Sequence, residues 1–141
     1  MDIDIEEWAS GARPAIRDMI DSLGGDVEAF DADPLSAVAV LDDLINRMPW
    51  RQFEENNWVW IHSELSAFIA EVLIHHYGGV WKAVPDASAP QGWAPVIQVC
   101  GKDGLARQVA PMVLVYQELH PFPQRIPRLV ERAAALAGHG P

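Results

Sequence analysis

Residues 54–81 read EENNWVWIHSELSAFIAEVLIHHYGGVW and contain the strongest helical pattern of the chain. Apolar side chains recur there with an angular step of about 100° per residue, which is typical of an α-helix. Other apolar residues occupy much of the opposite side, and a helix that is apolar nearly all round is usually buried between two layers. The sequence therefore predicts a helix from about Glu54 to Tyr77, ended by Gly78-Gly79, at the centre of the fold.

The residues after these glycines change to the pattern of strands. Two short strands are predicted at residues 80–84 and 93–100, joined by a loop that contains Pro, Asp, Ser and Gly. Pro95 favours an edge position or a late start for the second strand. Because an isolated pair of strands is marginally stable in water, we expect this antiparallel hairpin to pack against the central helix.

Two helices are predicted before the central one. Residues 5–23 have apolar side chains at helical spacing, although Pro14 leaves open a later start near Arg13. In the second helix, Asp33 caps the start, Pro34 occupies the first position and Pro49 follows the end. The apolar stripe of this second helix leaves Asp42 and Asp43 facing water.

The residues that follow the hairpin are predicted to be mainly helical. Residues 109–119 favour a helix that begins at Pro111, although residues 112–116 are also compatible with a buried strand. A last helix is expected over residues 124–137, with its arginines on the outer face, and residues 138–141 are expected to form a loose tail.

The length and these elements together predict one α+β domain over residues 1–141, mostly helical, with a long central helix and a small antiparallel β-hairpin. Within it we distinguish an acidic helical part, residues 1–55, and a neutral helix-hairpin-helix part, residues 56–137.

Charge is distributed unevenly between these parts. The chain has 20 Asp and Glu against 10 Lys and Arg, a net charge of −10. Residues 1–55 contain 14 acidic residues and 4 arginines, whereas residues 56–141 contain 6 acidic and 6 basic residues. This balance argues against binding to nucleic acid, which requires clustered cations. Concentrated negative charge either keeps the protein soluble or attracts a basic partner.

The sequence also contains signals that bear on the cellular location of the protein. Cys100 is the only cysteine, so no disulfide can form within the chain. The acidic start at Asp2 lacks the basic and apolar regions of a secretory signal, and no apolar stretch has the length of a membrane span. We therefore expect a cytoplasmic protein without a membrane partner.

Histidines and Cys100 are the residues to consider for chemistry. Glu71 and His75 are adjacent on one helix face, and they could bind a metal ion if a third ligand came from elsewhere, although a surface ion pair is commoner. His76 is expected to be a core histidine bonded to backbone. Cys100 would be a nucleophile only if a histidine such as His120 approached it. None of these patterns is a catalytic signature, so we predict no catalytic, cofactor or metal site and no enzyme.

Six tryptophans are a high count for this length, and most are expected in the core. Those near acidic residues point to a protein interface, because aromatic side chains with a negative rim suit a basic partner. The predicted docking face consists of Asp42, Asp43, Trp50, Glu54, Glu55 and Trp58.

The run from Glu64 to Trp81, followed by the strand at residues 96–99, resembles small uncharacterised bacterial α+β proteins in which a helix ends in Gly-Gly-x-Trp and continues into a short sheet. The resemblance covers about a quarter of the chain and transfers no catalytic residue. Some of those proteins are immunity-like, which implies a binding rather than a catalytic role.

The leading hypothesis is therefore a non-catalytic, acidic protein-binding module, immunity- or chaperone-like, that docks a basic protein and uses no cofactor. One alternative is a small-molecule binder or enzyme with a pocket lined by His and Trp between the central helix and the hairpin. A second alternative is a structural homodimer subunit.

Overall fold

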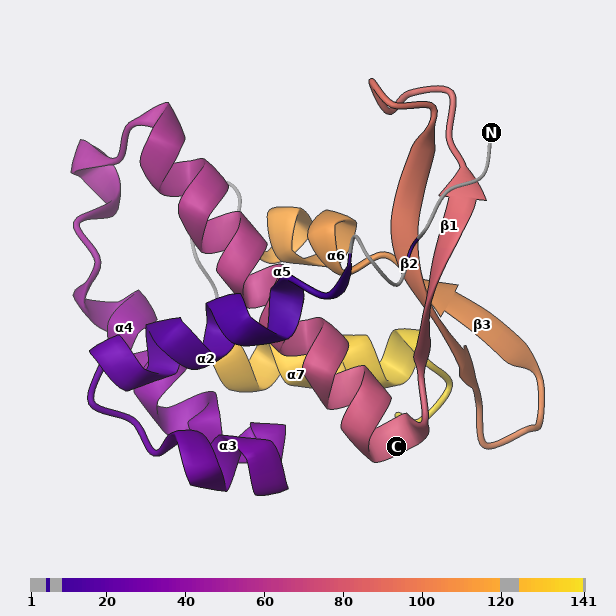
Figure 1. Ribbon diagram of the computed structural model, residues 1–141, viewed down its shortest axis with the longest axis horizontal. Coiled ribbons are helices and arrows are strands. Elements are labelled where there is room, and N and C mark those ends of the chain that lie inside the picture. The colour runs from indigo at the N-terminus through magenta and orange to yellow at the C-terminus, as the bar shows by residue number, and fades with distance from the viewer. Residues whose placement is uncertain (1–4, 6–8, 120–124, 141) are drawn as a thin grey trace.

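The computed structural model describes residue 5, residues 9–119 and residues 125–140. The predicted class is confirmed, because these residues form a mostly helical α+β fold with a long helix and a small antiparallel sheet (Figure 1). The elements in chain order are α2 (Ala12–Ser22), α3 (Val27–Ala32), the 3-10 turn η1 (Pro34–Ala37), α4 (Val38–Arg47), the 3-10 turn η2 (Trp50–Gln52), α5 (Glu55–Tyr77), β1 (Val80–Pro85), β2 (Trp93–Cys100), β3 (Ala106–Val109), α6 (Pro111–Leu119) and α7 (Ile126–Leu136).

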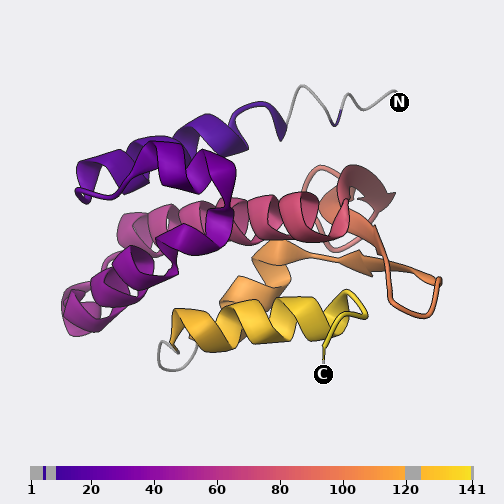
Figure 2. The same ribbon diagram turned by 90° about the horizontal axis from the view of Figure 1, so that it is seen from below.

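Helix α5 is the middle layer of the fold. It lies between α2 and α3 on one side and α6 and α7 on the other (Figure 2). Every residue from Leu65 to Leu73 is buried, which confirms a central helix that is covered on all sides. No helix in the described ranges is long and apolar enough to cross a membrane.

Both ends of α5 follow from local sequence. At its start, the side chains of Glu54 and Asn57 form a reciprocal capping box with each other's backbone. At its end, Gly78 adopts a left-handed conformation with φ 68°, which glycine tolerates best. A Cβ on Gly79 would lie 2.5 Å from Ile97 Cγ2, so the helix approaches the sheet closely only because Gly79 has no side chain.

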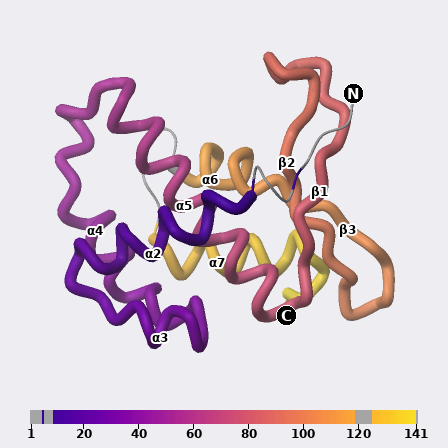
Figure 3. Tube along the Cα trace, in the orientation of Figure 1, coloured from indigo at the N-terminus to yellow at the C-terminus, as the bar shows by residue number. Residues whose placement is uncertain are grey.

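The sheet has three antiparallel strands in the order β1-β2-β3 and lies at one end of the helices (Figure 3). The first two strands confirm the predicted hairpin, whereas β3 was not predicted. Pro95 lies opposite Ala83 of β1, in the part of β2 that β3 does not reach. The missing N–H of Pro95 therefore interrupts no pairing with β3.

The helices before α5 follow one of the two predicted arrangements. Helix α2 begins at Ala12 with Pro14 in its first turn, as the later start required. The short helix α3 was not predicted. Asp33 caps the next segment as expected, because its carboxylate accepts a hydrogen bond of 2.9 Å from the Leu35 N–H. That segment begins as η1 and continues as α4.

After the sheet, α6 and α7 confirm a helix rather than a strand at residues 111–119 and a last helix before the C-terminus. The expectation of a loose tail is wrong for residues 138–140. The His139 imidazole stacks on Tyr77 with centroids 4.2 Å apart, and its Nε2 lies 2.7 Å from the Cys100 carbonyl oxygen. Lys102 Nζ also donates to the Gly140 carbonyl at 2.8 Å.

Candidate functional site

The structure separates the acidic residues of the predicted docking face. Asp42 is buried, with 7% of its surface exposed, so the expectation that it faces water is wrong. Its carboxylate accepts hydrogen bonds from Arg125 Nε at 2.8 Å and from the Ile126 N–H at 2.9 Å, because the start of α7 packs on α4. Arg125 holds the pKa of Asp42 below its usual range. Asp43 is exposed and pairs with Arg47 at 2.8 Å.

The two tryptophans of that predicted face support the turn between α4 and α5. Trp50 and Trp58 are half-buried and stack with centroids 5.3 Å apart, and Phe53 packs edge-on against Trp58. The indole N–H of Trp50 donates to the Ile45 carbonyl at 3.0 Å. Their main contacts are therefore within the protein, as the core-packing interpretation of the tryptophans expects.

A different part of α5 presents apolar side chains to solvent. Val59 is 58% exposed and Trp60 is 41% exposed. Helical spacing of four residues places Glu55, Val59 and Ser63 in one row and Trp60 and Glu64 in the neighbouring row. We call these five residues the α5 face.

The α5 face leads into a pocket of about 250 Å³ between α2, α5, α6 and β1. Small and apolar side chains form most of its wall. The lining residues are Gly11, Ala12, Ala15, Ser63, Glu64, Ser66, Ala67, Trp81 and Met112. Because Ser63 and Glu64 belong to both the face and the pocket, the two form one continuous surface.

Glu64 is the charged residue in the wall of this pocket. Its Oε2 is buried, and no described residue donates a hydrogen bond to that oxygen. Burial raises the pKa of Glu64, and the negative charge of Asp18 raises it further. Asp18 lies on α2 about one turn beyond the pocket residue Ala15, and its negative charge acts on Glu64.

Among the acidic side chains of residues 9–55, Asp31, Asp42 and Asp43 each form an ion pair with arginine. Asp31 pairs with Arg13 and Arg17, in each case at 3.0 Å. In the described part of the chain, Asp18 and Glu64 form no ion pair. Glu64 therefore brings an unbalanced negative charge to the pocket wall, and the charge of Asp18 acts on it from α2.

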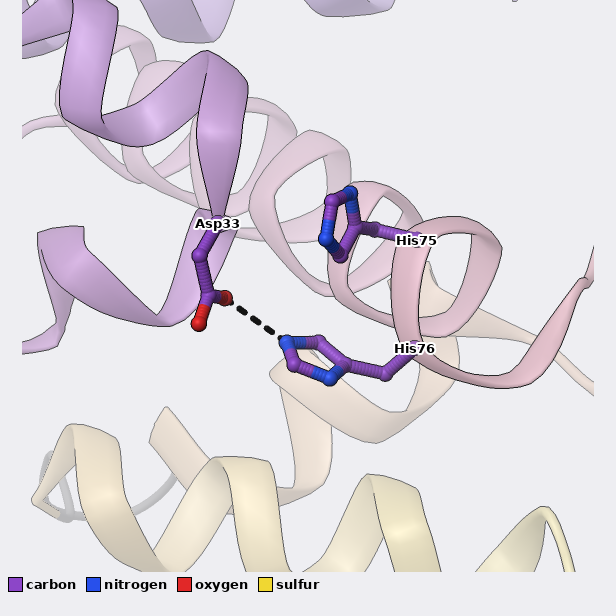
Figure 4. Close-up of side chains that lie close together, drawn as sticks. All are labelled: Asp33, His75 and His76. Atoms are coloured by element: carbon purple, nitrogen blue, oxygen red, sulfur yellow. Dashed lines mark hydrogen bonds and ion pairs between the residues drawn. The ribbon is translucent and has the colours of Figure 1, made fainter.

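Glu71 and the histidines near the end of α5 differ from expectation. Glu71 is buried and accepts a hydrogen bond from an Arg13 guanidinium nitrogen at 3.2 Å. His76 is not a core histidine bonded to backbone, because its ring Nε2 lies 2.7 Å from Asp33 Oδ1 and its side chain is 28% exposed. Figure 4 shows His75 and His76 on one side of α5, both directed toward Asp33. The Leu35 N–H and His76 lower the pKa of Asp33.

A pocket between α5 and the hairpin exists, but its chemistry differs from the predicted one. Two pockets reach from α5 to Trp81 of β1, and the described residues that line them include Glu64 in one and Glu71 in the other, with no histidine. Cys100 is exposed. The proposed approach of His120 to Cys100 lies outside the described residues.

Sequence reasoning did not select Asp18, Glu64 or Trp60 as site residues. One signal was present for Glu64, because a single carboxylate among small and apolar residues of a buried helix requires a partner. Asp18 carries no such signal, since it becomes relevant only through the packing of α2 on α5.

Comparison of the chain with protein-family models, with curated proteins and with solved structures finds no match.

Proposed function

We propose that this protein is a non-catalytic binding module for a basic protein partner, and that its α5 face receives a cationic side chain of that partner. The observation that carries the proposal is the buried Oε2 of Glu64, which has no donor among the described residues and belongs to a side chain in the wall of an apolar pocket. A buried acceptor without a donor costs free energy. A guanidinium or ammonium group supplies donors and the opposite charge together.

The lining of the pocket suits the side chain of arginine or lysine. Such side chains lay a methylene stem along apolar surface and place the charge at its end. Here Ala67 and Met112 contribute apolar surface, and Glu64 contributes negative charge, with the charge of Asp18 acting on it from α2. The pocket therefore matches both the apolar stem and the charged end of such a side chain.

The exposed part of the α5 face supports contact with a protein rather than with an isolated ion. Exposed tryptophan is common among the residues that dominate protein interfaces. Trp60 lies one turn before Glu64, and the exposed Val59 lies beside it. Glu55 adds a negative rim at the start of the helix, where the predicted docking face also placed it. Steering by these charges makes association with a basic partner faster and dependent on salt.

Two labelled peptide libraries test this proposal. They are identical except that one has arginine and the other has citrulline, its neutral analogue, at one fixed position between apolar residues. We expect arginine peptides to bind about tenfold more tightly by fluorescence anisotropy, with affinity falling as salt increases. Glu64→Gln should remove this preference, whereas Asp43→Asn removes the same charge elsewhere and should retain it. Equal binding of both libraries would refute the proposal.

A small cationic ligand is the second candidate, and the volume of about 250 Å³ favours it. Pentylguanidinium alone distinguishes the two, because it tests the pocket without the surrounding peptide. If the free cation binds as tightly as the best peptide, the protein is a small-molecule binder. If the peptide binds more tightly than the free cation, and Trp60→Ala lowers the affinity for the peptide to that for the free cation, the partner is a protein.

The homodimer is the remaining alternative, since Met112, Val113 and Tyr116 of α6 are also more than 45% exposed. Measurement of mass in solution over a range of concentrations decides it. A monomer leaves the α5 face accessible to a partner. A stable dimer that Trp60→Ala dissociates would assign the α5 face to a second copy of the chain.

A further inference from the structure

We propose that Asp33, His75 and His76 form a binding site for a zinc-type divalent transition-metal ion. One ligand atom from each of the three side chains can be chosen so that all lie within 4.8 Å of one another. Figure 4 shows the two imidazole rings and the carboxylate arranged around one space between α5 and the start of η1. The proposal does not depend on the α5 face, because His75 lies eleven residues beyond Glu64, about 16 Å along the helix.

The backbone explains why these residues meet. Asp33 has an extended conformation, with φ −156° and ψ 111°, and precedes η1. Its Oδ1 accepts the Leu35 N–H at 2.9 Å, which holds the carboxylate toward α5. The other two residues belong to the last turn of α5, immediately before the left-handed Gly78. Packing of η1 on α5 therefore brings together residues that are 42 and 43 positions apart.

Imidazole nitrogen and carboxylate oxygen are suitable ligands for Zn²⁺. Zinc binds these ligands at about 2.0–2.2 Å in tetrahedral geometry, which places neighbouring donor atoms about 3.3 Å apart. His76 Nε2 and Asp33 Oδ1 are now 2.7 Å apart, so they need to separate slightly around an ion. His75 needs to move inward, and because its side chain is exposed, rotation about its own bonds is sufficient.

The surrounding charges leave the three ligands accessible. Arg13 pairs with Asp31 and Glu71, and Arg17 pairs with Asp31. Within the described ranges, the ion pair of Asp33 is with His76 alone. A metal ion therefore replaces a hydrogen bond between two of its own ligands and displaces no arginine. With three protein ligands, one tetrahedral position remains for water, as in an open zinc site.

Titration calorimetry of the untagged protein with zinc chloride tests this site. We expect one ion per chain with micromolar affinity, and no comparable binding of magnesium, which prefers oxygen ligands. Zinc should also raise the melting temperature, because it binds the folded arrangement of η1 and α5 and not the unfolded chain.

Four single variants and one double variant locate the ion. Asp33→Asn retains a residue that can cap η1, so it removes the charged ligand without removing the cap. This variant, His75→Ala and His76→Ala should each weaken zinc binding by about tenfold or more. His139→Gln is the control, because it removes a histidine outside the site and should bind zinc as the wild type does. Absence of stoichiometric binding, or binding that survives the double variant His75→Ala/His76→Ala, would overturn the proposal.

Discussion

Asp42 and Asp43 are adjacent acidic residues with opposite surroundings, and replacing each by alanine gives a sharp test of the structure. Asp42 is buried and accepts hydrogen bonds from Arg125 and from the Ile126 N–H at the start of α7. Asp43 is exposed, and among the described residues its ion pair is with Arg47, one helical turn away. Each substitution removes one negative charge from a protein of net charge −10, so effects of overall charge are matched.

The expected cost of Asp42→Ala follows from the bonds it loses. Removing the acceptor of a helix N-terminal N–H costs about 1 kcal/mol. The charge-assisted bonds between Asp42 and Arg125 contribute about 1 kcal/mol more. This value is at the low end of the usual range for such bonds, because the Arg125 side chain is 64% exposed. The total of about 2 kcal/mol corresponds to a fall in melting temperature of about 6–8 °C for a chain of this length. Asp43→Ala should cost about 0.5 kcal/mol or less.

Urea denaturation at neutral pH measures both free energies of unfolding. The effect of Asp42 also depends on pH in a defined direction. Because its pKa is lowered in the folded protein, its stabilisation is present above the ordinary value of 3.8 and is lost as pH falls through the lower folded pKa. The difference between wild type and Asp42→Ala should shrink in that acid range. Equal stability losses for the two alanine variants would refute the placement of α7 on α4.

Three further predictions concern other residues. Glu64→Gln should raise the free energy of unfolding at neutral pH by about 1 kcal/mol in urea denaturation. The reason is that an acid whose pKa is raised in the folded state destabilises that state increasingly as pH rises through the ordinary value of 4.5. A loss of stability would contradict an unpartnered oxygen. Gly79→Ala should lower the melting temperature by several degrees, since its Cβ would meet Ile97 at 2.5 Å, and an unchanged melting curve would contradict that close approach. Trp60→Ala should leave the free energy of unfolding within about 0.5 kcal/mol of wild type while weakening peptide binding. Trp50→Ala, in contrast, should lower the free energy of unfolding by about 3 kcal/mol or more. Similar losses for both tryptophans would contradict their different exposure.

Sequence reasoning succeeded where the determinants are local. The central helix, its Gly-Gly end and the hairpin after it depend on periodicity and on residues with specific backbone preferences. Pro111 marked the start of α6 for the same reason. These elements were predicted within a few residues because each signal lies inside the element itself.

The errors concern contacts between distant parts of the chain. Asp42 lies beside the apolar stripe of α4, and only the arrival of Arg125, 83 positions later, makes its burial favourable. His76 was assigned to the core from the stripe of α5, but η1 brings Asp33 to it instead. The short strand β3 has few residues with high strand propensity, and its pairing with β2 decides its conformation.

The candidate site was predicted only in kind. The predicted docking face combined acidic residues with Trp50 and Trp58, and of its residues Glu55 also belongs to the α5 face. A pocket between α5 and the hairpin was expected as an alternative, but its full lining could not be predicted, because it requires α2 and α6 as well as β1 to meet α5. Such a meeting depends on tertiary packing rather than on any local pattern.

The central proposal is that the carboxylate of Glu64 receives a cationic side chain, and a titration with pentylguanidinium observed by two-dimensional NMR tests it most directly. Comparison with pentanol, which has the same chain without the charge, separates the contribution of the charge from that of the apolar stem. We expect saturable shifts of the backbone amides of Ser63, Ala67 and Met112 with the cation, much weaker shifts with pentanol, and loss of the cation's advantage in Glu64→Gln. Equal responses to both compounds, or an unchanged response in Glu64→Gln, would contradict the proposal.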